Sequence, residues 1–576
     1  MECSTLEVPK LMWEGDDLKP VWIRSLQDSN IDPTKYIFRM ALPTILGSAL
    51  CFILMVVLLP NIFGGPYLVI LFSISVAVII SIFILLPFAK WQNRRKRIEQ
   101  EMHLFITRVG VLSTSDISRK GIFDIMLEMK EYGELAREIN KIYVLLDKWG
   151  LSIGDACRRI AKSTPSIMFG DFLERLAYAV ESGEEPKDFF AAEQEIILEQ
   201  YKVLYGQAAD TIAMAGEIFI AISMVMTFLI LIVALLPFIL GINTTAMFYL
   251  SALLFIAVEC LMLYVFVAYV PRERVWEDTD LRTKVSQKLD FYFVGSLGAC
   301  VIMGIIIFVF MDHTLPLVGN SFPISTAITL SPLMVTGYYT RKMEEEIIRR
   351  DNNFAAFIRS LGSTTETSSI APVQALKRLL NHDFGPLTQN VKALYDRVNL
   401  RIDPVLSWKY FGAETGSDLI TKFSGMFVRG LEAGGKPGKA ANIISFNFTK
   451  LLGLRQKRYT IASSLSGLFI GIAIVISIVM FMASALVEVL EALVTKTGAD
   501  KSYIEVEVLF SQAYNLDLFI NLMFVLVIVH AGITALIHII IAAGHKYGAF
   551  LNFVIMIWIG AVMSKLAPWV IKSLLG

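Results

Sequence analysis

The fold is decided by a short stretch, Glu181-Ser182-Gly183-Glu184-Glu185-Pro186, which returns about 250 residues later as Glu432-Ala433-Gly434-Gly435-Lys436-Pro437. Both copies read Glu-x-Gly-x-x-Pro. In each copy we expect the first glycine to be the left-handed C-cap of an amphipathic helix, and the proline to open a longer helix that runs into a membrane span. A repeat of this size predicts a duplicated helical domain.

The sequence around the two turns keeps the same register. Phe172 and Leu176 precede the first turn as Phe423 and Phe427 precede the second, and each copy also carries an aromatic-glycine pair before a helix, at residues 132–133 and 384–385. Apolar residues upstream recur at spacings of three and four, which predicts one buried face of a helix in each copy. The first face comprises Leu135, Ile139, Ile142, Leu146 and Trp149, and the second comprises Leu387, Val391, Leu394, Val398 and Ile402.

Composition indicates a polytopic membrane protein. Hydrophobic residues make up 55% of the 576 residues, which is more than in a typical soluble protein. The formal net charge is zero, so no overall basic field favours nucleic acid as a partner. The five cysteines are far apart in the chain, which excludes the paired spacing of a zinc or redox motif.

Nine apolar stretches are long enough to cross a hydrocarbon core of roughly 30 Å. Lys and Arg cluster in the connections that the positive-inside rule assigns to the cytoplasm. This pattern predicts a cytoplasmic N-terminus and an external C-terminus. Lys572 is the one charge that argues against an external C-terminus. The predicted spans are 37–59, 67–88, 216–240, 247–270, 289–311, a proline-interrupted span ending near 339, 461–487, 516–543 and 548–568.

The predicted fold class is therefore an all-α polytopic membrane protein with about nine transmembrane helices and two duplicated cytoplasmic helical-bundle domains. The expected divisions are a cytoplasmic N-terminal arm (1–35), a transmembrane hairpin (36–89), the first helical domain (90–215), four transmembrane helices (216–340), the second helical domain (341–460) and three C-terminal transmembrane helices (461–576) with an acidic external segment at 488–515. Because the arm has charges of both signs and no apolar start, it is not a cleavable signal peptide.

The second turn also resembles a nucleotide-binding loop. Residues 430–436 match the first seven positions of a P-loop, but Pro437 stands where Ser or Thr should hold magnesium. The preceding residues read as a helix rather than the required strand, so we favour the capping role for this turn. Glu181 and Glu432 lie unfavourably in the last turn of a helix, which points to a polar contact with the next helix or with a partner protein.

Glu259, His530 and His538 are among the ionisable residues that fall within predicted spans. Such residues are expensive in hydrocarbon, so a transport or proton-relay role has to be weighed. One acid and two histidines are few for a transport pathway, and hydrogen bonding between helices is the favoured interpretation. The sequence contains no catalytic constellation, metal-ligand cluster or cofactor motif, so the chain is not predicted to be an enzyme and no cofactor is expected.

A basic cluster, Arg341, Lys342, Arg349 and Arg350, follows the fourth of the internal spans. The positive-inside rule and contact with anionic lipid headgroups account for it. Docking of an acidic cytoplasmic partner is an equal alternative, because these residues could extend a membrane helix straight into the second domain.

Two cytoplasmic helical domains, each with Glu-x-Gly-x-x-Pro before a helix that enters the membrane, resemble the F-type platform domain of type II secretion and type IV pilus machines. The resemblance covers about residues 92–240 and 341–487. The chain length, the inserted and additional spans and the run Gly385-Pro386-Leu387 resemble more narrowly the archaeal branch, and within it the archaellum assembly platform. The two turns differ at Glu184-Glu185 against Gly435-Lys436, so the domains are not expected to make identical contacts.

The resemblance implies a non-enzymatic platform in the cell membrane. Its implied partners are a hexameric secretion-type ATPase, archaellin or pilin filament subunits, a second copy of the chain in a homodimer, and the lipid bilayer. The residues that would contact the ATPase or shape the contacting surface are Glu181, Gly183, Pro186, Glu432, Gly434, Gly435, Lys436 and Pro437, with the basic cluster. The alternatives are the platform of another archaeal pilus or secretion system, and a transporter with regulatory helical domains.

Overall fold

The computed structural model describes residues 90–115, 126, 129–240, 245–271, 273–277, 281, 284–310, 322–368, 371–496 and 516–575. These parts of the chain are helical, and their one β feature is an isolated bridge between Trp276 and Ser417. The predicted absence of strands is confirmed for them. The N-terminal arm, the first two predicted spans and most of the external segment lie outside the described residues.

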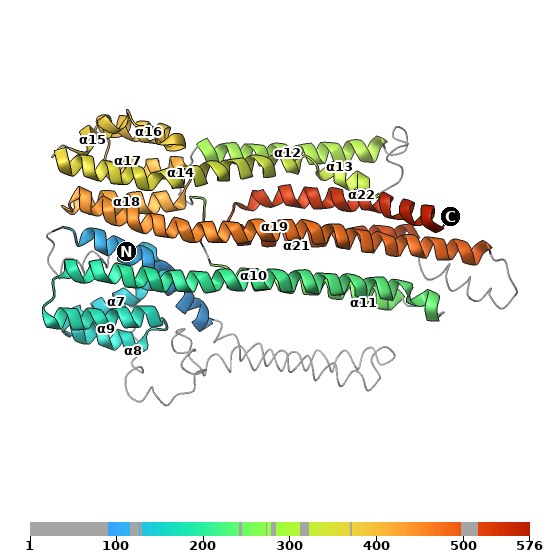
Figure 1. The fold of residues 1–576 in the computed structure, drawn as a ribbon, viewed down its shortest axis with the longest axis horizontal. Helices are drawn as coiled ribbons and strands as arrows, with labels where there is room; N and C mark the ends of the chain where they lie inside the picture. The colour runs from blue at the N-terminus through green and yellow to red at the C-terminus, as the bar shows by residue number, and fades with distance from the viewer. Residues whose placement is uncertain are drawn as a thin grey trace. The chain divides into compact units, whose positions relative to one another are not determined.

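The chain divides between Tyr201 and Lys202 into two compact units. In the first unit, residues 90–112 form a helix. Four further helices follow: η3 (Lys130–Tyr132), α7 (Gly133–Asp147), α8 (Ile153–Ser163) and α9 (Ile167–Ser182). The helix α10 (Pro186–Leu240) begins in this unit and continues into the second (Figure 1).

An aromatic core holds the first unit together. The fully buried Phe172 ring packs edge-on against Phe105 of the first helix and stacks with Phe169 of its own helix. Phe189, at the start of α10, lies against the same ring. Burying each side chain of this size contributes roughly 1.5–3 kcal/mol. Of the face that the sequence predicts on α7, Leu135, Ile139 and Ile142 are buried.

The second unit contains the membrane helices and the second helical domain. Its membrane helices are α11 (Thr245–Tyr269), α12 (Lys284–Phe310), α13 (Phe322–Leu330), α21 (Leu516–Ala542) and α22 (Ala549–Leu575), with the short helix η5 (Lys546–Gly548) before α22. Its domain helices are α14 (Leu333–Ser368), α15 (Pro372–Leu379), η4 (Gly385–Leu387), α16 (Thr388–Asn399), α17 (Pro404–Thr415) and α18 (Asp418–Glu432). The last domain helix, α19 (Pro437–Lys496), is also the longest and continues as a membrane helix.

Six described helices are long and apolar enough to cross a membrane. Each contains one of the predicted spans between residue 216 and the C-terminus. The remaining predicted span of that region is not one helix, because it is divided into α13 and the start of α14 at Ser331-Pro332. Proline has no backbone N–H and clashes with the preceding helical turn, so the helix breaks at this proline, as the sequence predicts.

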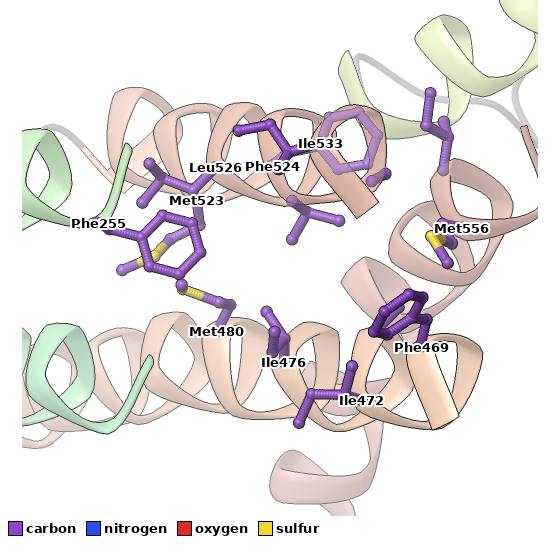
Figure 2. Close-up of a cluster of buried hydrophobic side chains, with 14 of the residues drawn as sticks. Phe255, Phe469, Ile472, Ile476, Met480, Met523, Phe524, Leu526, Ile533 and Met556 are labelled. Atoms are coloured by element: carbon purple, nitrogen blue, oxygen red, sulfur yellow. The ribbon is translucent and has the colours of Figure 1, made fainter. Parts of the chain in front are cut away.

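The membrane part is held by apolar side chains from α11, α19, α21 and α22. Figure 2 shows Phe255, Phe469, Met480, Met523 and Met556 facing one another from these helices, and all five are buried. Flexible methionines and large rings fill the irregular space between four helices. The long helix α19 lies against both α14 and α22 (Figure 1), so the second domain and the membrane helices share one continuous scaffold.

Of the predicted buried faces, Leu146 and Val398 are half-buried and two further residues are exposed. Trp149 was expected on the buried face of α7, and Ile402 on that of α16, but both side chains are exposed. The reason is that α7 ends at Asp147 and α16 ends at Asn399, so the helical period no longer applies to either residue.

Candidate functional site

The two Glu-x-Gly-x-x-Pro turns have the geometry that their sequence predicts. Gly183, the C-cap of α9, has a φ of 79°, and Gly434 has a φ of 83°. Both lie in the left-handed region, where glycine has no Cβ to clash. Pro186 and Pro437 are the first residues of α10 and α19. Residues 418–432 are helical, so the strand that a P-loop requires before its glycines is absent.

The glutamates of the two turns have different surroundings. Glu181 is paired with Arg158 of α8, so its polar contact is to the helix before it in the bundle rather than to the next helix. Glu432 and Lys436 are exposed at the second turn, and neither side chain has a hydrogen bond or ion pair within the described part of the chain. Gly435 between them is buried and donates its N–H to the carbonyl of Gly430.

The basic cluster lies on α14, which runs without a break from Leu333 to Ser368. The expected continuation of a membrane segment into the second domain is therefore present. Arg341, Lys342 and Arg349 are exposed, whereas Arg350 is half-buried and donates to the carbonyl of Thr415 at 2.9 Å. Arg350 thus supports the end of α17 from inside the domain.

The most concentrated group of polar contacts lies where the second domain meets the membrane helices, and we call it the junction. Its centre is Arg455 of α19, which is buried. The guanidinium Nε lies 2.5 Å from Oε1 of Glu273, and Nη1 lies 3.4 Å from Oδ2 of Asp351 on α14. The other terminal nitrogen of Arg455, Nη2, donates a hydrogen bond to the carbonyl of Arg274 at 2.9 Å. One cation therefore joins α19, α14 and the connection between α11 and α12.

That connection is also bonded to the domain through its backbone. The N–H of Glu277 donates to the carbonyl of Gly416, and the N–H of Asp418 donates to the carbonyl of Val275. Between these bonds, Trp276 donates its indole N–H to Glu344 of α14 at 2.9 Å. A connection between two membrane helices is thereby fixed to the turn between α17 and α18.

The C-terminal end of α21 joins the junction through Arg458, one helical turn after Arg455. Arg458 donates to the carbonyls of Ile540 and Ile541 at 2.8 and 2.6 Å, which satisfies carbonyls that a helix end leaves unpaired. The backbone N–H of His545, in the following turn, donates to Glu344 at 2.5 Å. Thus α14, α19, the 271–277 connection and the end of α21 meet at the junction.

Burial and charge act in opposite directions on the acids of the junction. Burial raises the pKa of Asp351 to about 6, although the Arg455 charge and the Ser417 hydroxyl oppose the shift. Burial likewise raises the pKa of Glu344 against the hydrogen bonds from His545 and Trp276. For Glu273, burial is outweighed by the charges of Arg455 and Arg458, and the pKa is lowered.

The two domains share the acid of the junction but not its arginine. Ser417, the N-cap of α18, donates to Asp351, and Ser166, the N-cap of α9, donates to Glu99 at the corresponding place. In the first domain, Glu99 pairs with Arg95 on its own helix. At the offset that relates the two prolines, Arg455 corresponds to Leu204. The link from the acid to the long helix is therefore a feature of the second copy.

The sequence did not point to these junction residues. In the sequence, Arg455 and Arg458 fall among the cytoplasmic charges that the positive-inside rule accounts for before the predicted span 461–487, and Glu273 lies between the predicted spans 247–270 and 289–311. The available signal was the interruption of an apolar helical face by two arginines one turn apart. No local sequence pattern identifies Asp351 as a partner of Arg455, because it lies about 100 residues before Arg455.

Glu259, His530 and His538 each bond to a side chain of a neighbouring helix. Glu259 of α11 lies 2.9 Å from Nδ1 of His530 on α21 and accepts the hydroxyl of Ser223 on α10 at the same distance. Glu259 and His530 are both buried. His538 contacts Asn552 of α22 at 3.1 Å. These contacts support the interpretation as hydrogen bonds between helices.

Comparisons with known proteins agree with this architecture. The family profile of type II secretion system protein F matches twice, at residues 105–234 and 357–485. The chain is 33% identical over 553 residues to flagella accessory protein J of Methanocaldococcus jannaschii, covering 95% of this chain and 97% of that protein.

The chain belongs to the flagella accessory protein J family.

The same-named protein of Methanococcus voltae is 29% identical over 550 residues, again covering 95% of this chain and 97% of the relative. No solved structure matches the chain. Members of the flagella accessory protein J family are non-enzymatic membrane components, and this chain is a multi-pass cell-membrane platform protein of the archaellum or type IV pilus type. No group of metal-binding side chains occurs among the residues that the structure describes.

Proposed function

We propose that this protein is the membrane platform of archaellum assembly and rotation, and that it couples a cytoplasmic hexameric ATPase to the insertion of filament subunits. The observation that carries the proposal is the pair of helices α10 and α19. Each starts at a Glu-x-Gly-x-x-Pro turn in a helical domain and continues as a membrane helix, over 55 and 60 residues. A helix carries its hydrogen bonds along its length, so it can transmit a displacement of the domain.

The second domain is suited to pass such a displacement into the membrane. The junction joins α14, α19, the 271–277 connection and the end of α21 through buried charged contacts. Removing one member of a buried pair typically costs about 3–5 kcal/mol, so these elements are expected to move together. Movement at the domain would then reach α11, α12, α21 and α22.

The contact for the ATPase is proposed to include the second turn. Glu432 and Lys436 are exposed beside Gly434 and at the start of α19, and no described residue pairs with them. Arg341, Lys342 and Arg349 add an exposed basic surface on α14. In the first domain, the paired Glu181 is proposed to shape the tip with Gly183 and Pro186 rather than to contact the partner directly.

The N-terminus is proposed to be cytoplasmic, and the working form to be a homodimer with filament subunits and lipid around the membrane helices. The archaellum is favoured over another archaeal pilus because both curated relatives are flagella accessory proteins. The transporter alternative is disfavoured by Glu259 and His530, which are buried against each other and against the rings of Phe219 and Phe255.

The proposal is tested by replacing the chromosomal copy with Glu432→Ala plus Lys436→Ala. The expected result is loss of ATPase co-purification and of filaments, while the amount of protein in the membrane is unchanged. The matched control is Asp210→Ala plus Lys457→Ala, which likewise removes one exposed acid and one exposed lysine, at another place on the protein. Normal filaments and normal ATPase recovery in the first variant would contradict the proposed contact.

A further inference from the structure

Each helical domain exposes a large apolar side chain directly after one of two corresponding helices, α7 in the first domain and α16 in the second. Trp149 follows the end of α7 and is 60% exposed, and Leu400 follows the end of α16 and is 73% exposed. The two residues are separated by the same offset that relates Glu181 to Glu432. They are therefore equivalent positions of the duplicated domain, and both lie in its aqueous part.

The backbone holds both side chains in the same way. The next residue is left-handed in each copy, with a φ of 63° at Gly150 and 62° at Arg401. After the turn the chain folds back, because Leu151 donates to the carbonyl of Leu145 and Ile402 donates to that of Arg397. A left-handed conformation is unfavourable for arginine. The second copy thus keeps the turn although glycine has been replaced.

Both side chains lie at the end of the domain that carries the Glu-x-Gly-x-x-Pro turn. In the first domain, α8 and α9 form a hairpin, and Gly154 at the start of α8 touches the carboxylate of Glu181 at the end of α9. In the second, α17 and α18 are joined by two residues, so the start of α17 lies beside the end of α18.

Each apolar side chain is also accompanied by an exposed cation. Lys148 precedes Trp149, and Arg401 follows Leu400. No hydrogen bond, ion pair or ring contact is found for any of these four side chains within the described part of the chain. An apolar side chain beside a positive charge fits an apolar socket with an acidic rim. Tryptophan and arginine are enriched among the residues that carry most of the binding energy of protein interfaces.

We propose that Trp149 and Leu400 are equivalent docking residues, each inserting into an acidic-rimmed apolar socket on one subunit of the oligomeric ATPase. This inference rests on the proposed function and adds the recognition surface to it. The duplication specifies the kind of partner, because two matching projections call for two matching sockets. An oligomer of identical subunits supplies them, whereas a monomeric partner would have to contain an internal repeat.

The experiment measures binding of the purified ATPase to the full-length protein in lipid nanodiscs by biolayer interferometry. Trp149→Ala and Leu400→Ala are each expected to weaken binding at least tenfold, and the double variant further. The matched controls are Ile167→Ala and Phe446→Ala, which remove side chains that are 60% and 49% exposed at other places on the two domains. They are expected to bind within twofold of the wild type.

Four outcomes would overturn the inference. Binding of both single variants and the double variant at wild-type strength would overturn it, and so would an equal loss in the controls. A drop in the mass of the Trp149→Ala or Leu400→Ala particle at unchanged ATPase binding would assign the surface to a second copy of this chain, and would also overturn it. If the wild-type protein itself does not bind the ATPase, the proposed function fails, and this inference fails with it. Measurements on the variants alone could not distinguish that case.

Discussion

Arg455 and Glu273 form an ion pair at 2.5 Å between a helix of the second domain and the connection between two membrane helices. Arg455 is buried and also reaches Asp351. Because the pair joins elements 182 residues apart in sequence, it fixes the domain to the membrane part in a way that the local helices could not.

Replacing Arg455 with methionine is therefore expected to destabilise the protein by about 3 kcal/mol, because Asp351 is left buried without its cation. Thermal unfolding of the protein in detergent measures the change. Lys457→Met, two residues further along α19, breaks only the exposed pair with Asp210 and should cost less than about 1 kcal/mol. Equal midpoints for the two variants would show that the junction contributes no more than a surface contact.

The crossing of α14 and α19 depends on Gly362. A Cβ at this position would lie 2.2 Å from that of Ala441 and 2.7 Å from the backbone carbonyl oxygen of Pro437. Gly362→Ala should therefore lower the unfolding midpoint, with a cost of about 1–3 kcal/mol for the enforced shift. Gly453→Ala, in an open part of α19, should be neutral or stabilise by up to about 1 kcal/mol. If both substitutions had the same effect, the close helix crossing would be wrong.

His545 should make the protein sensitive to acid. Burial, with a smaller effect from Lys546, lowers the pKa of His545 to about 4. The unfolded chain binds a proton near pH 6.5, so the stabilising effect of neutral His545 is complete above that pH and is lost as the pH falls toward 4. His545→Asn retains a side-chain acceptor for the N–H of Tyr547 and should reduce this loss.

The measurement is the unfolding midpoint between pH 7.5 and pH 4.5 for the wild type, His545→Asn and the exposed control His382→Asn. The wild type and the control should lose several more degrees than His545→Asn over this range. Parallel curves for all three proteins would contradict the assignment to His545.

The contacts of Glu259 predict different results for two substitutions. Glu259→Gln keeps an oxygen that can accept from Ser223 and His530, whereas Glu259→Leu leaves two buried donors unpaired and should cost about 1–3 kcal/mol. Unfolding in detergent again measures this, with the exposed neighbour Cys260→Ala as the control. A transporter would instead show loss of activity in Glu259→Gln at full stability.

Helical periodicity and turn chemistry predicted most of the fold. The glycine and proline of each turn determine where α9 and α18 end and where α10 and α19 begin, because left-handed backbone and a missing N–H are local properties. Apolar length predicted the membrane helices that the structure describes. The break at Ser331-Pro332 also follows from the local sequence.

The predictions failed where the result depends on contacts or on the last turn of a helix. Trp149 and Ile402 continue the apolar period of their helices, yet α7 ends at Asp147 and α16 at Asn399, so the period no longer applies to either residue. The partners of Arg455 are distant in sequence, so no local pattern identifies them. Glu181 was expected to contact the next helix or another protein, but Arg158 on α8 is its partner.

The central claim, that the tips of the two helical domains engage the ATPase, is tested most directly by amine cross-linking in native membranes followed by mass spectrometry. Lys148, Lys436 and Lys439 are exposed at the tips, whereas Lys457 is exposed further along α19. Cross-links to the ATPase are expected from the tip lysines and not from Lys457. An ATPase that co-purifies but cross-links only through Lys457, or tip lysines that cross-link only to other proteins, would contradict it.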